Sequence, residues 1–408
     1  MKTLIKISWR NIWRNRTRSL IIIVAIVLGL LGGVFSAAVR LGVEQQQFTE
    51  TVENQISHIQ IHHPEFLANP EARFTIENGM ELVQSLNEHP DIQVAAPRIV
   101  FDGMVASANM NAGVRIKGIN PENESKTTSL DELIIEGTYF EDNGRLPSVI
   151  IGRELANHLN VGTGSRIVLT FQDPQGEMVS ASFRIEGLFE VSDNRFEKRM
   201  VFVRKEVINQ FIEAPDAVSE IALVLHQQDN YRAVTTDLRE RYPGLEIRHW
   251  ADMAPALYFS LEFLDQNLIW LVGIIILGVS FGLLNTILMS VLERTRELGV
   301  LMAIGMKKLR VFSMVMLETT MVATLGGLIG LPLCYIMVRM LNQHGLDLAG
   351  EGGEGLGEYG YASVIYPNIE TAFYFQILGV VVLFAILAAI YPALKAIRLV
   401  PAQAVRQE

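Results

Sequence analysis

Cysteine is almost absent from this sequence of 408 residues, in which Cys334 stands alone. A single cysteine excludes an intrachain disulfide framework and any metal site built from several cysteines. The sequence also lacks the G-x-x-x-x-G-K-[ST] phosphate-binding loop and has no Gly-Lys dipeptide, which excludes ATP hydrolysis by the P-loop route. The G-x-S-x-G and H-E-x-x-H patterns of hydrolases and zinc proteases are missing as well. We therefore expect no catalytic residue, no metal site and no cofactor in this chain.

Charged residues are also scarce, at 19% of the chain against about a quarter in soluble proteins. The net charge is nevertheless -10, and the mean hydropathy is +0.27. Apolar and acidic stretches must therefore be separated along the chain. The acidic balance and the lack of a basic, aromatic-rich stretch exclude nucleic acid from the expected partners.

Four long apolar stretches are present, at residues 19–39, 267–292, 311–341 and 371–393. At about 1.5 Å per residue, a helix over the first would span roughly 32 Å, enough for a hydrocarbon core of about 30 Å. The first stretch is too long for the apolar region of a signal peptide, and no small-residue cleavage motif closes it. The sequence therefore predicts four transmembrane helices, the first of them an uncleaved anchor.

Basic and acidic residues alternate between the segments that join these helices. Residues 1–18 contain six basic and no acidic residues. Residues 293–310 contain five basic and two acidic residues, and residues 394–408 contain three basic residues and one acidic residue. Residues 41–266 have 18 basic and 35 acidic residues, and residues 342–370 have five acidic and no basic ones. Because cytoplasmic segments are enriched in Lys and Arg, both termini are predicted to be cytoplasmic, and residues 40–266 and 342–370 to lie outside.

Residues 1–18 have the pattern of an amphipathic helix. One face carries apolar residues at helical spacing, namely Leu4, Ile5, Trp9, Ile12 and Trp13. Lys6, Arg10 and Arg14 repeat every four residues on another face. This pattern is typical of a cytoplasmic helix that lies on anionic lipid. The alternative is a basic flank of the first span in which the tryptophans have no part in lipid binding.

Residues 40–266 are predicted to form an α+β domain with helical stalks. Leu41, Phe48, Val52 and Ile56 continue the first span at helical spacing, and Leu257, Tyr258, Leu261 and Leu264 lead into the second. Strands are predicted at 56–61, 93–97, 114–119, 148–151, 166–171, 180–189, 200–203 and 220–225, and helices at 79–88, 153–159, 204–212 and 230–241. A hairpin turn is predicted at 173–176. We place a candidate second lobe near 129–145 and leave its boundary open.

Two groups of polar residues in this domain are candidates for chemistry. His58, Gln60 and His62 share one face of a predicted strand, but imidazoles four residues apart lie about 13 Å from each other, too far to share a zinc ion. We therefore predict a solvated strand face. A basic group could meet an acidic partner or form a solvated loop, and we favour the loop; its members are Arg195, Lys198, Arg199, Arg204 and Lys205.

Three stretches resemble a known family. Residues 291–308 read V-L-E-R-T-R-E-L-G-V-L-M-A-I-G-M-K-K, residues 391–406 read Y-P-A-L-K-A-I-R-L-V-P-A-Q-A-V-R, and residues 9–22 read W-R-N-I-W-R-N-R-T-R-S-L-I-I. They resemble the FtsX-like (MacB-type) ABC transporter permeases. I-G-R-E-L-A at 151–156 and L-N-V-G at 159–162 resemble the MacB-type periplasmic core. S-H-I-Q-I at 57–61 suits the lipoprotein-releasing (LolC/LolE) branch better than the macrolide-exporter branch.

The resemblance implies an α-helical membrane protein with four transmembrane helices and a large α+β periplasmic domain between helices 1 and 2. The implied division is an amphipathic helix at 1–18, spans at 19–39, 267–292, 311–341 and 371–393, a periplasmic core with stalks at 40–266, a coupling loop at 293–310, a short periplasmic loop at 342–370 and a cytoplasmic tail at 394–408.

The resemblance also implies partners. Two permease subunits, identical or different, would pair in the bacterial inner membrane with cytoplasmic ABC ATPases that bring ATP-Mg. The residues implied in coupling to the ATPase are Glu293, Arg294, Glu297, Leu298, Gly299, Ala303 and Gly305. Closure of the ATPases would be transmitted to the periplasmic domain, a mode of action called mechanotransmission.

We expect the substrate to be a lipoprotein extracted from the outer leaflet of the inner membrane. The alternatives are an efflux permease working with a periplasmic adaptor, and a non-transporting, FtsX-like regulator of cell-wall hydrolases. The lipoprotein-releasing branch includes a permease with a long hook that captures a periplasmic carrier, and the short 172–177 turn argues against such a hook here. Lateral entry of the substrate from the membrane would require an apolar path along the outer halves of spans one and two. The residues predicted to line it are Phe35, Val39, Phe48, Leu264, Leu268 and Leu271. The alternative is that these residues face lipid or the second subunit.

The predicted spans contain glycine pairs and one acid. Three G-x-x-x-G pairs allow close helix approach, at Gly29 and Gly33, Gly278 and Gly282, and Gly326 and Gly330. We expect at least one pair at the interface between permease subunits. Glu318 is the only acid inside a span, which makes it a functional candidate, although we favour a role in helix packing.

Overall fold

A computed structural model of the chain describes residues 2–14, 16–141, 145–347 and 364–398, without the side chains of residues 2–4, 264–269, 271–272 and 279. Contacts divide the chain into two compact units. The helical unit comprises Met1–Glu44, Leu261–Leu346 and Ile365–Glu408. The sheet unit comprises Gln45–Ser260 and Asp347–Val364.

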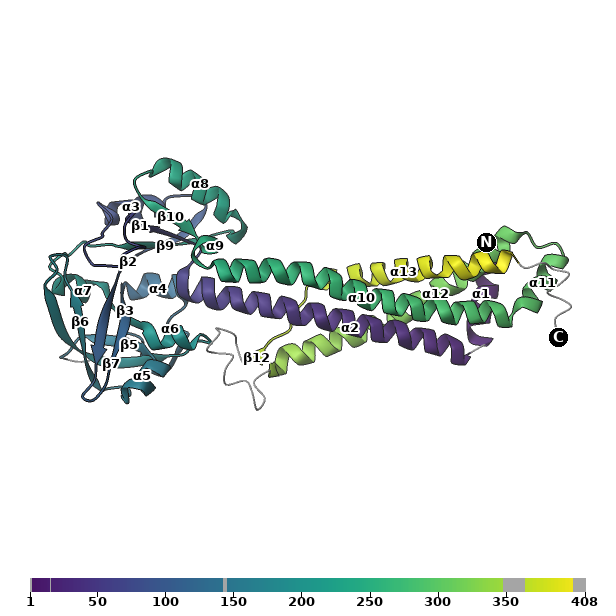
Figure 1. Cartoon of the computed structure of the whole chain (residues 1–408), viewed down its shortest axis with the longest axis horizontal. Coiled ribbons are helices and arrows are strands. Elements are labelled where there is room, and N and C mark those ends of the chain that lie inside the picture. The colour runs from purple at the N-terminus through teal and green to yellow at the C-terminus, as the bar shows by residue number, and fades with distance from the viewer. Residues whose placement is uncertain (1, 15, 142–144, 348–363, 399–408) are drawn as a thin grey trace. The chain divides into compact units, whose positions relative to one another are not determined.

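The helical unit is built from long apolar helices that lie alongside one another (Figure 1). Its helices are α1 Lys2–Arg14, α2 Arg16–Phe48, α10 Pro255–Glu293, α11 Thr295–Ala303, α12 Lys308–His344 and α13 Thr371–Ile397. Among the described residues, four helices are long and apolar enough to cross a membrane, and they correspond to α2, α10, α12 and α13. Each predicted span falls within one of these four helices.

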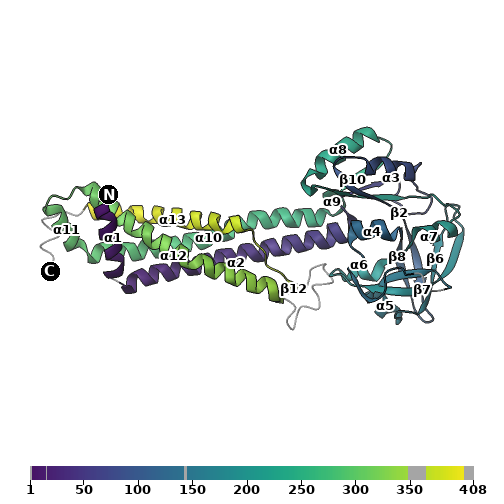
Figure 2. The same cartoon turned by 180° about the vertical axis from the view of Figure 1, so that it is seen from behind.

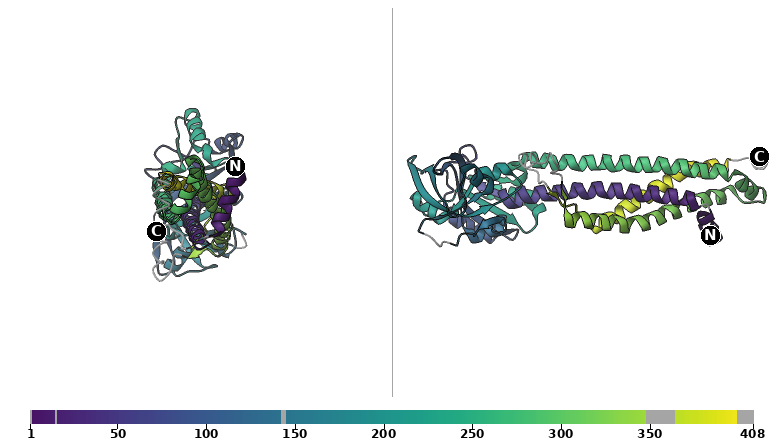
Figure 3. Two further views of the ribbon diagram at one scale, coloured as in Figure 1. Left: turned by 90° about the vertical axis from the view of Figure 1, so that its right-hand side faces the viewer. Right: turned by 90° about the horizontal axis from the view of Figure 1, so that it is seen from below.

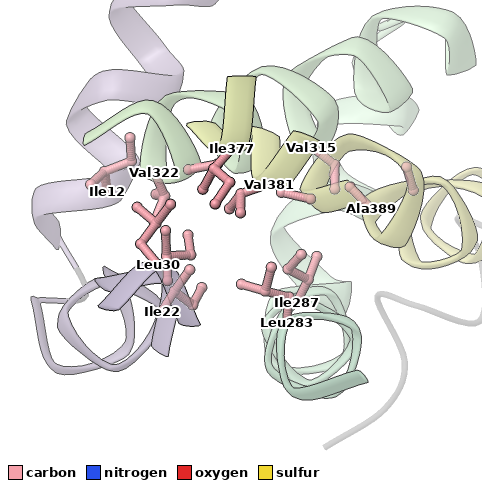
Figure 4. Close-up of a cluster of buried hydrophobic side chains, with 14 of the residues drawn as sticks. Ile12, Ile22, Leu30, Leu283, Ile287, Val315, Val322, Ile377, Val381 and Ala389 are labelled. Carbon is pink, nitrogen blue, oxygen red and sulfur yellow. The ribbon is translucent and has the colours of Figure 1, made fainter. Parts of the chain in front are cut away.

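One buried apolar cluster joins the helices of this unit (Figure 4). The side chains that meet in it come from α1 (Ile12), α2 (Ile22, Leu30), α10 (Leu283, Ile287), α12 (Val315, Val322) and α13 (Ile377, Val381, Ala389). Helices α12 and α13 pack along each other and cross in the view from below (Figure 3). Because Ile12 is buried in the same cluster, α1 is held by the bundle as well as by its covalent link to α2.

The three glycine pairs have different surroundings. A methyl group added to Gly326 would lie 2.9 Å from Cγ2 of Ile26, and one added to Gly330 would lie 2.8 Å from Cδ1 of Leu30. This pair therefore brings α12 close to α2 within the chain. Gly29 is half-buried and Gly33 is buried, whereas Gly278 and Gly282 are exposed on α10 with nothing within 4 Å of an added methyl group. The subunit interface stays a prediction, and the exposed pair is best placed for it.

The sheet unit contains all the predicted strands and helices, with shifted ends. Its strands are β1 Ile59–His62, β2 Ile92–Ala106, β3 Asn111–Ile119, β4 Ile134–Gly137, β5 Ser148–Gly152, β6 Arg166–Gln172, β7 Met178–Phe189, β8 Met200–Arg204, β9 Glu220–Leu225 and β10 Glu246–His249. Its helices are the π-helix η1 Thr49–Ile56, α3 Gly79–Asn87, α4 Pro121–Thr128, α5 Arg153–Leu159, α6 Asn194–Arg199, α7 Lys205–Phe211, the 3₁₀-helix η2 Gln228–Asn230, α8 Tyr231–Arg241 and α9 Trp250–Met253. Strands β11 Leu346–Asp347 and β12 Val364–Ile365 pair separately. The sequence did not predict the strands β4, β10, β11 and β12 or the helices α4, α6, α9 and η2.

Strand β2 is long enough to serve two lobes. Its first half pairs with β9, and its second half pairs with β3 and β6. Because β6 also pairs with β7, strands β2, β3, β8, β5, β7 and β6 close into a ring around one apolar core. Strands β10, β1, β9 and the start of β2 form the second lobe with α3 and α8, around another core. The second lobe near 129–145 stays a prediction. In the described part of this stretch, β4 pairs with β7 of the ring, while Leu130 and Phe140 pack with Phe189 and Phe202 in an apolar cluster separate from the ring core.

The predicted turn between β6 and β7 is confirmed. The Gly176 amide donates to the Asp173 carbonyl at 3.0 Å, and Gly176 has a φ of +88°. The Asp173 carboxylate accepts from the amides of Gln175 and Glu177, both at 2.9 Å. A positive φ and a side chain that closes the turn explain why Asp and Gly occupy these positions.

The prediction that His58, Gln60 and His62 form a solvated face is wrong. Strand β1 lies between β9 and β10, and all three side chains are buried. Nδ1 of His58 accepts from the Leu225 amide at 3.0 Å, and Nε2 of His62 lies 3.0 Å from the Gln60 amide oxygen. Burial lowers the pKa of both imidazoles. The alternation of polar residues reflects hydrogen bonding in the interior, which a sequence pattern does not distinguish from exposure.

The five residues of the predicted basic group do not form one exposed patch. Arg195 pairs with Asp193, and Lys198 pairs with Glu154. Arg204 donates to the Phe140 carbonyl, and Lys205 is buried. Arg199 is exposed at the end of α6. The prediction of a solvated loop is wrong, because the five residues lie in α6, at the end of β8 and at the start of α7. Their separate contacts favour a structural role over binding of an acidic partner.

A buried charge network lies where β2 passes between the two lobes. Nε and Nη2 of Arg98 donate to Glu124 at 2.8 and 2.7 Å, and Nη1 donates to Glu220 at 2.7 Å. Lys117 donates to the Gln55 carbonyl of η1 at 3.3 Å. Burial alone would raise the pKa of Glu220, but Lys117 and Arg98 lower it to about 2. Burial lowers the pKa of Lys117 to about 8. The network thus joins β2, β3, β9 and α4 to the helical segment η1.

Candidate functional site

Six charged side chains gather at one end of the helical unit. They are Arg14 of α1, Arg18 of α2, Glu293 of α10, Glu297 of α11, Glu318 of α12 and Arg294, which separates α10 from α11. We call them the charged cluster. Three arginines meet three glutamates, so the cluster is balanced in charge. It joins five helices, and α1 lies beside α12 near α11 (Figure 2).

Local sequence explains why the chain turns at this place. Helix α10 ends at Glu293, and the Thr295 hydroxyl donates to the Leu292 carbonyl at 2.6 Å. Helix α11 buries Leu298 and Gly299 against the bundle. It ends before Gly305, which has a φ of +101° and whose amide donates to the Met302 carbonyl at 3.1 Å. Glycine is favoured at such a helix end because it adopts a positive φ without steric cost.

Glu297 connects α11 with α1. Its carboxylate lies 2.6 Å from Nη2 of Arg14 and 3.1 Å from Nε of Arg294. Burial would raise the pKa of Glu297, but hydrogen bonds from Arg14 and Arg294 lower it below its ordinary value, so the carboxylate is ionised at neutral pH. The side chains of Arg14 and Glu297 are each 50% exposed. An exposed pair of this kind contributes only about 0–1 kcal/mol to stability.

Of the remaining members, Arg18, Arg294 and Glu318 are largely buried in the bundle, whereas Glu293 is exposed. The Arg294 side chain is 12% exposed, and its Nη1 lies 3.2 Å from Glu318. Arg18 pairs with Glu293 and donates to the Ser290 hydroxyl at 2.7 Å. A cavity of ≈ 40 Å³ lies beside these groups. Its lining combines the polar residues Arg18, Ser290, Arg294, Glu318 and Thr319 with apolar residues of α2, α10, α11 and α12. The pairing of Glu318 with Arg294 supports the helix-packing role predicted for this acid.

Exposed apolar residues follow one another from α11 into the start of α12, and we call them the exposed apolar edge of α11. Val300 of α11 is 40% exposed, Ile304 directly after α11 is 79% exposed, and Leu309 in the first turn of α12 is 73% exposed. Arg296, Lys307 and Lys308 are exposed around them. The sequence predicts an apolar edge on this cytoplasmic segment, but it did not single out these three residues. The signal was available, since Val300 and Ile304 lie four residues apart and off the face that Leu298 buries.

The residues predicted for ATPase coupling fall into two groups. Glu293, Glu297, Ala303 and Gly305 are exposed. Leu298 and Gly299 are buried, and Arg294 is directed toward Glu318. The first group can contact another protein directly, whereas the second can act only by holding α11 in place.

The residues predicted for the substrate path are only partly described. Phe35 is exposed and Val39 is half-buried on α2. The Phe48 ring packs against Trp250, with ring centroids 5.2 Å apart. The side chains of Leu264, Leu268 and Leu271 lie outside the described residues. Within the described part of the chain, no three His, Cys, Asp or Glu side chains are grouped to hold a metal ion.

Comparison with known families gives two matches that cover most of the chain. Residues 269–401 match the FtsX-like permease C-terminal family, and residues 19–241 match the MacB-like periplasmic core domain. The FtsX-like match contains the exposed apolar edge of α11. It also contains the members of the charged cluster from Glu293 to Glu318.

Curated relatives include lipoprotein-releasing proteins, a pyoverdine export protein and the macrolide export ATP-binding/permease protein MacB of Bdellovibrio bacteriovorus, to which the chain is 23% identical over 98% of this chain and 61% of that one. The chain is 25% identical to the lipoprotein-releasing system transmembrane protein LolC of Xylella fastidiosa, over 78% of this chain and 79% of that one. It is 23% identical to the lipoprotein-releasing system transmembrane protein LolE of Haemophilus influenzae, over 99% of each chain. It is also 23% identical to the pyoverdine export ATP-binding/permease protein PvdT of Pseudomonas putida, over 98% of this chain and 59% of that one.

Proposed function

Because the chain belongs to the MacB/Lol-type family of ABC transporter permeases, we propose that it couples ATP hydrolysis by a separate ATPase to a conformational change outside the membrane. The observation that carries this proposal is the exposed apolar edge of α11, with its back face joined to α1, α2, α10 and α12. Val300, Ile304 and Leu309 form the contact with the ATPase. The charged cluster passes the movement of α11 on to the bundle.

The proposed setting is the inner membrane of a bacterium, as part of a homodimer or heterodimer of permeases. Both termini and α11 face the cytoplasm, in agreement with the excess of Lys and Arg in these segments. The acidic residues 41–266, which contain the strands of the main sheet, lie in the periplasm between the first and second spanning helices. ATP-Mg is bound by the partner ATPase.

We propose a lipoprotein anchored in the outer leaflet as the substrate. The similarity to the LolC and LolE proteins supports this substrate class. Lateral entry follows from the chemistry of an acyl chain, because each CH₂ group exposed to water costs about 0.8 kcal/mol. The second candidate is export of a small molecule with a periplasmic adaptor, which the similarity to the pyoverdine exporter supports.

Charge reversal tests the coupling surface. In the complex purified with its native ATPase, Glu297→Lys should reduce ATPase stimulation several-fold while the permease remains in the membrane. The matched control is Glu240→Lys, an exposed glutamate on α8 of the sheet unit. The swap Arg14→Glu with Glu297→Arg restores the ion pair and separates its role from direct contact with the ATPase. Unchanged association and activity after reversal of both Glu293 and Glu297 would reject the assignment of this surface.

Photo-crosslinking tests the substrate. A photoreactive residue at Phe48, Leu264 or Leu268 should capture a lipoprotein in cells, and the adduct should diminish while the ATPase turns over. The control position is Leu387, an exposed residue of α13. Adducts with the second permease alone, under all nucleotide conditions, would favour export of another substrate.

A further inference from the structure

Helix α1 presents three distinct stripes. Ser8, Asn11 and Ile12 are buried, and the Ser8 hydroxyl donates to the Met314 carbonyl of α12 at 3.4 Å. Ile5, Trp9 and Trp13 repeat every four residues and are exposed, with the indole rings edge to face and their centroids 6.1 Å apart. At about 100° per residue, these stripes are adjacent on the helix. The bundle therefore covers one side of α1 and leaves its tryptophans open.

Apart from Arg14, the basic residues on and directly next to α1 have no acidic partner among the described residues. Lys6 and Arg10 form a basic stripe with Arg14 and are exposed, as is Arg16 at the start of α2. Among the described residues, no ion pair involves Lys6, Arg10 or Arg16, and residues 1–18 contain no acid. An exposed tryptophan stripe beside uncompensated cations matches the boundary between acyl chains and anionic headgroups.

We propose that α1 is a docking surface for anionic phospholipid, and that Arg14 makes the position of α11 depend on this lipid. Arg14 is the last member of the basic stripe and also the partner of Glu297, at 2.6 Å. The pair is exposed, so it forms only where the rest of α1 holds Arg14 in place. Lipid bound to Lys6, Arg10 and Arg16 adds to the bundle contacts of Ser8 and Ile12 that already hold α1, and so favours the position of α1 in which Arg14 meets Glu297. The lipid-docking part stands alone, whereas the control of coupling rests on the proposed function.

Fluorescence quenching tests the docking surface without any ATPase. The full chain is placed in nanodiscs that contain either brominated phosphatidylglycerol or brominated phosphatidylcholine. The tryptophan fluorescence of α1 is obtained by subtracting the fluorescence of the Trp9→Phe/Trp13→Phe variant from that of the unmodified chain. We expect stronger quenching by the anionic lipid, and loss of this preference in Lys6→Gln/Arg10→Gln/Arg16→Gln.

The matched control removes the same number of positive charges from the start of α12. Lys307→Gln/Lys308→Gln/Arg310→Gln should keep the preference for the anionic lipid at α1. Equal quenching by both lipids, or no quenching of Trp9 and Trp13 by either, would overturn the proposal. A normal lipid preference in the Lys6/Arg10/Arg16 variant together with weaker ATPase binding would assign the surface to the protein partner instead.

The second experiment tests the role of Arg14. In the complex with its native ATPase, the ATPase rate should be several-fold higher in nanodiscs with phosphatidylglycerol than in phosphatidylcholine alone. In Arg14→Gln the ATPase rate should be the same in both lipids, and in Arg14→Lys part of the difference should remain. A ratio that is unchanged in Arg14→Gln would overturn the lipid control of coupling. Failure of the unmodified chain to bind or stimulate the ATPase would count against the proposed function, while the quenching result would still decide lipid docking.

Discussion

Arginine has two different roles in this chain, and burial decides which. Arg98 is fully buried and holds two glutamates, whereas Arg14 is half exposed and holds one. Removing one partner of a buried pair leaves an uncompensated charge in the interior, but an exposed charge is stabilised by water. The first arrangement maintains the fold, and the second can form and break during function.

Removal of Arg98 should therefore be costly. Arg98→Met leaves Glu124 and Glu220 buried without their partner, and we expect a loss of about 3–5 kcal/mol in the free energy of unfolding of the sheet unit. The control is Arg115→Gln, which breaks the exposed pair of Arg115 with Asp102 and should cost at most about 1 kcal/mol. Hydrogen exchange of peptides from β2 and β9 in the full chain measures both values. Similar losses in the two variants would contradict a structural role for the network.

Glu220 also predicts a pH dependence. Its folded pKa of about 2 lies below the ordinary value of 4.5, so the unfolded chain binds more protons between these two pH values. Stability is therefore present above pH 4.5 and is lost as the pH falls toward 2, by at most about 1.4 kcal/mol per pH unit from this group. The urea midpoint at pH 5, 4 and 3, followed by circular dichroism, should fall less steeply in Glu220→Gln than in the unmodified chain. Parallel curves would show that Glu220 does not contribute, with Glu240→Gln as the exposed control.

At the scale of elements, glycine decides which helices approach closely. Gly326 and Gly330 let α12 rest on Ile26 and Leu30 of α2. Gly278 and Gly282 have the same spacing, but they lie on a face of α10 that also exposes Ile274 and Phe281. The same motif thus serves packing within the chain in one helix and is free for a second subunit in another.

Leucine substitution separates these two uses. Gly326→Leu should force α12 away from α2 and destabilise the monomer by about 1–3 kcal/mol, seen as a lower melting temperature in detergent. Gly278→Leu should leave the melting temperature of the monomer unchanged and weaken pairing of permease subunits, seen by size-exclusion chromatography of the complex. If Gly278→Leu leaves subunit pairing intact, this glycine pair does not lie at the interface.

At the scale of the whole molecule, the segregation of charge along the chain predicts the topology in the membrane. The single cysteine, Cys334, is buried, which makes the protein suitable for cysteine labelling. Cysteines at Gln228 and at Gly353, which lies outside the described residues, should react with an impermeant reagent from the periplasmic side. A cysteine at Lys307 should react only after the membrane is opened. The reverse pattern would contradict the orientation.

Much of the site could be predicted from the sequence, because the turn between α10 and α12 is formed by residues that are close together in the chain. Glu293, Glu297 and Gly305 lie within one short segment, and Gly305 is needed for a positive φ that its neighbours cannot supply cheaply. The partners of these residues could not be predicted. Arg14 and Glu318 are distant in sequence from α11, and no periodicity indicates which glutamate an arginine meets.

The sequence by itself determined the four apolar helices, the eight strands that it predicted and the turn at Asp173, because hydrophobic periodicity and turn chemistry act over a few residues. Only the tertiary structure decided that β2 serves two lobes, that His58 and His62 are buried, and that Arg14 meets Glu297. Those features depend on which segments pair across long separations. Such pairing is set by the packing of the whole chain, and a local pattern of polar and apolar residues is compatible with several arrangements of this kind.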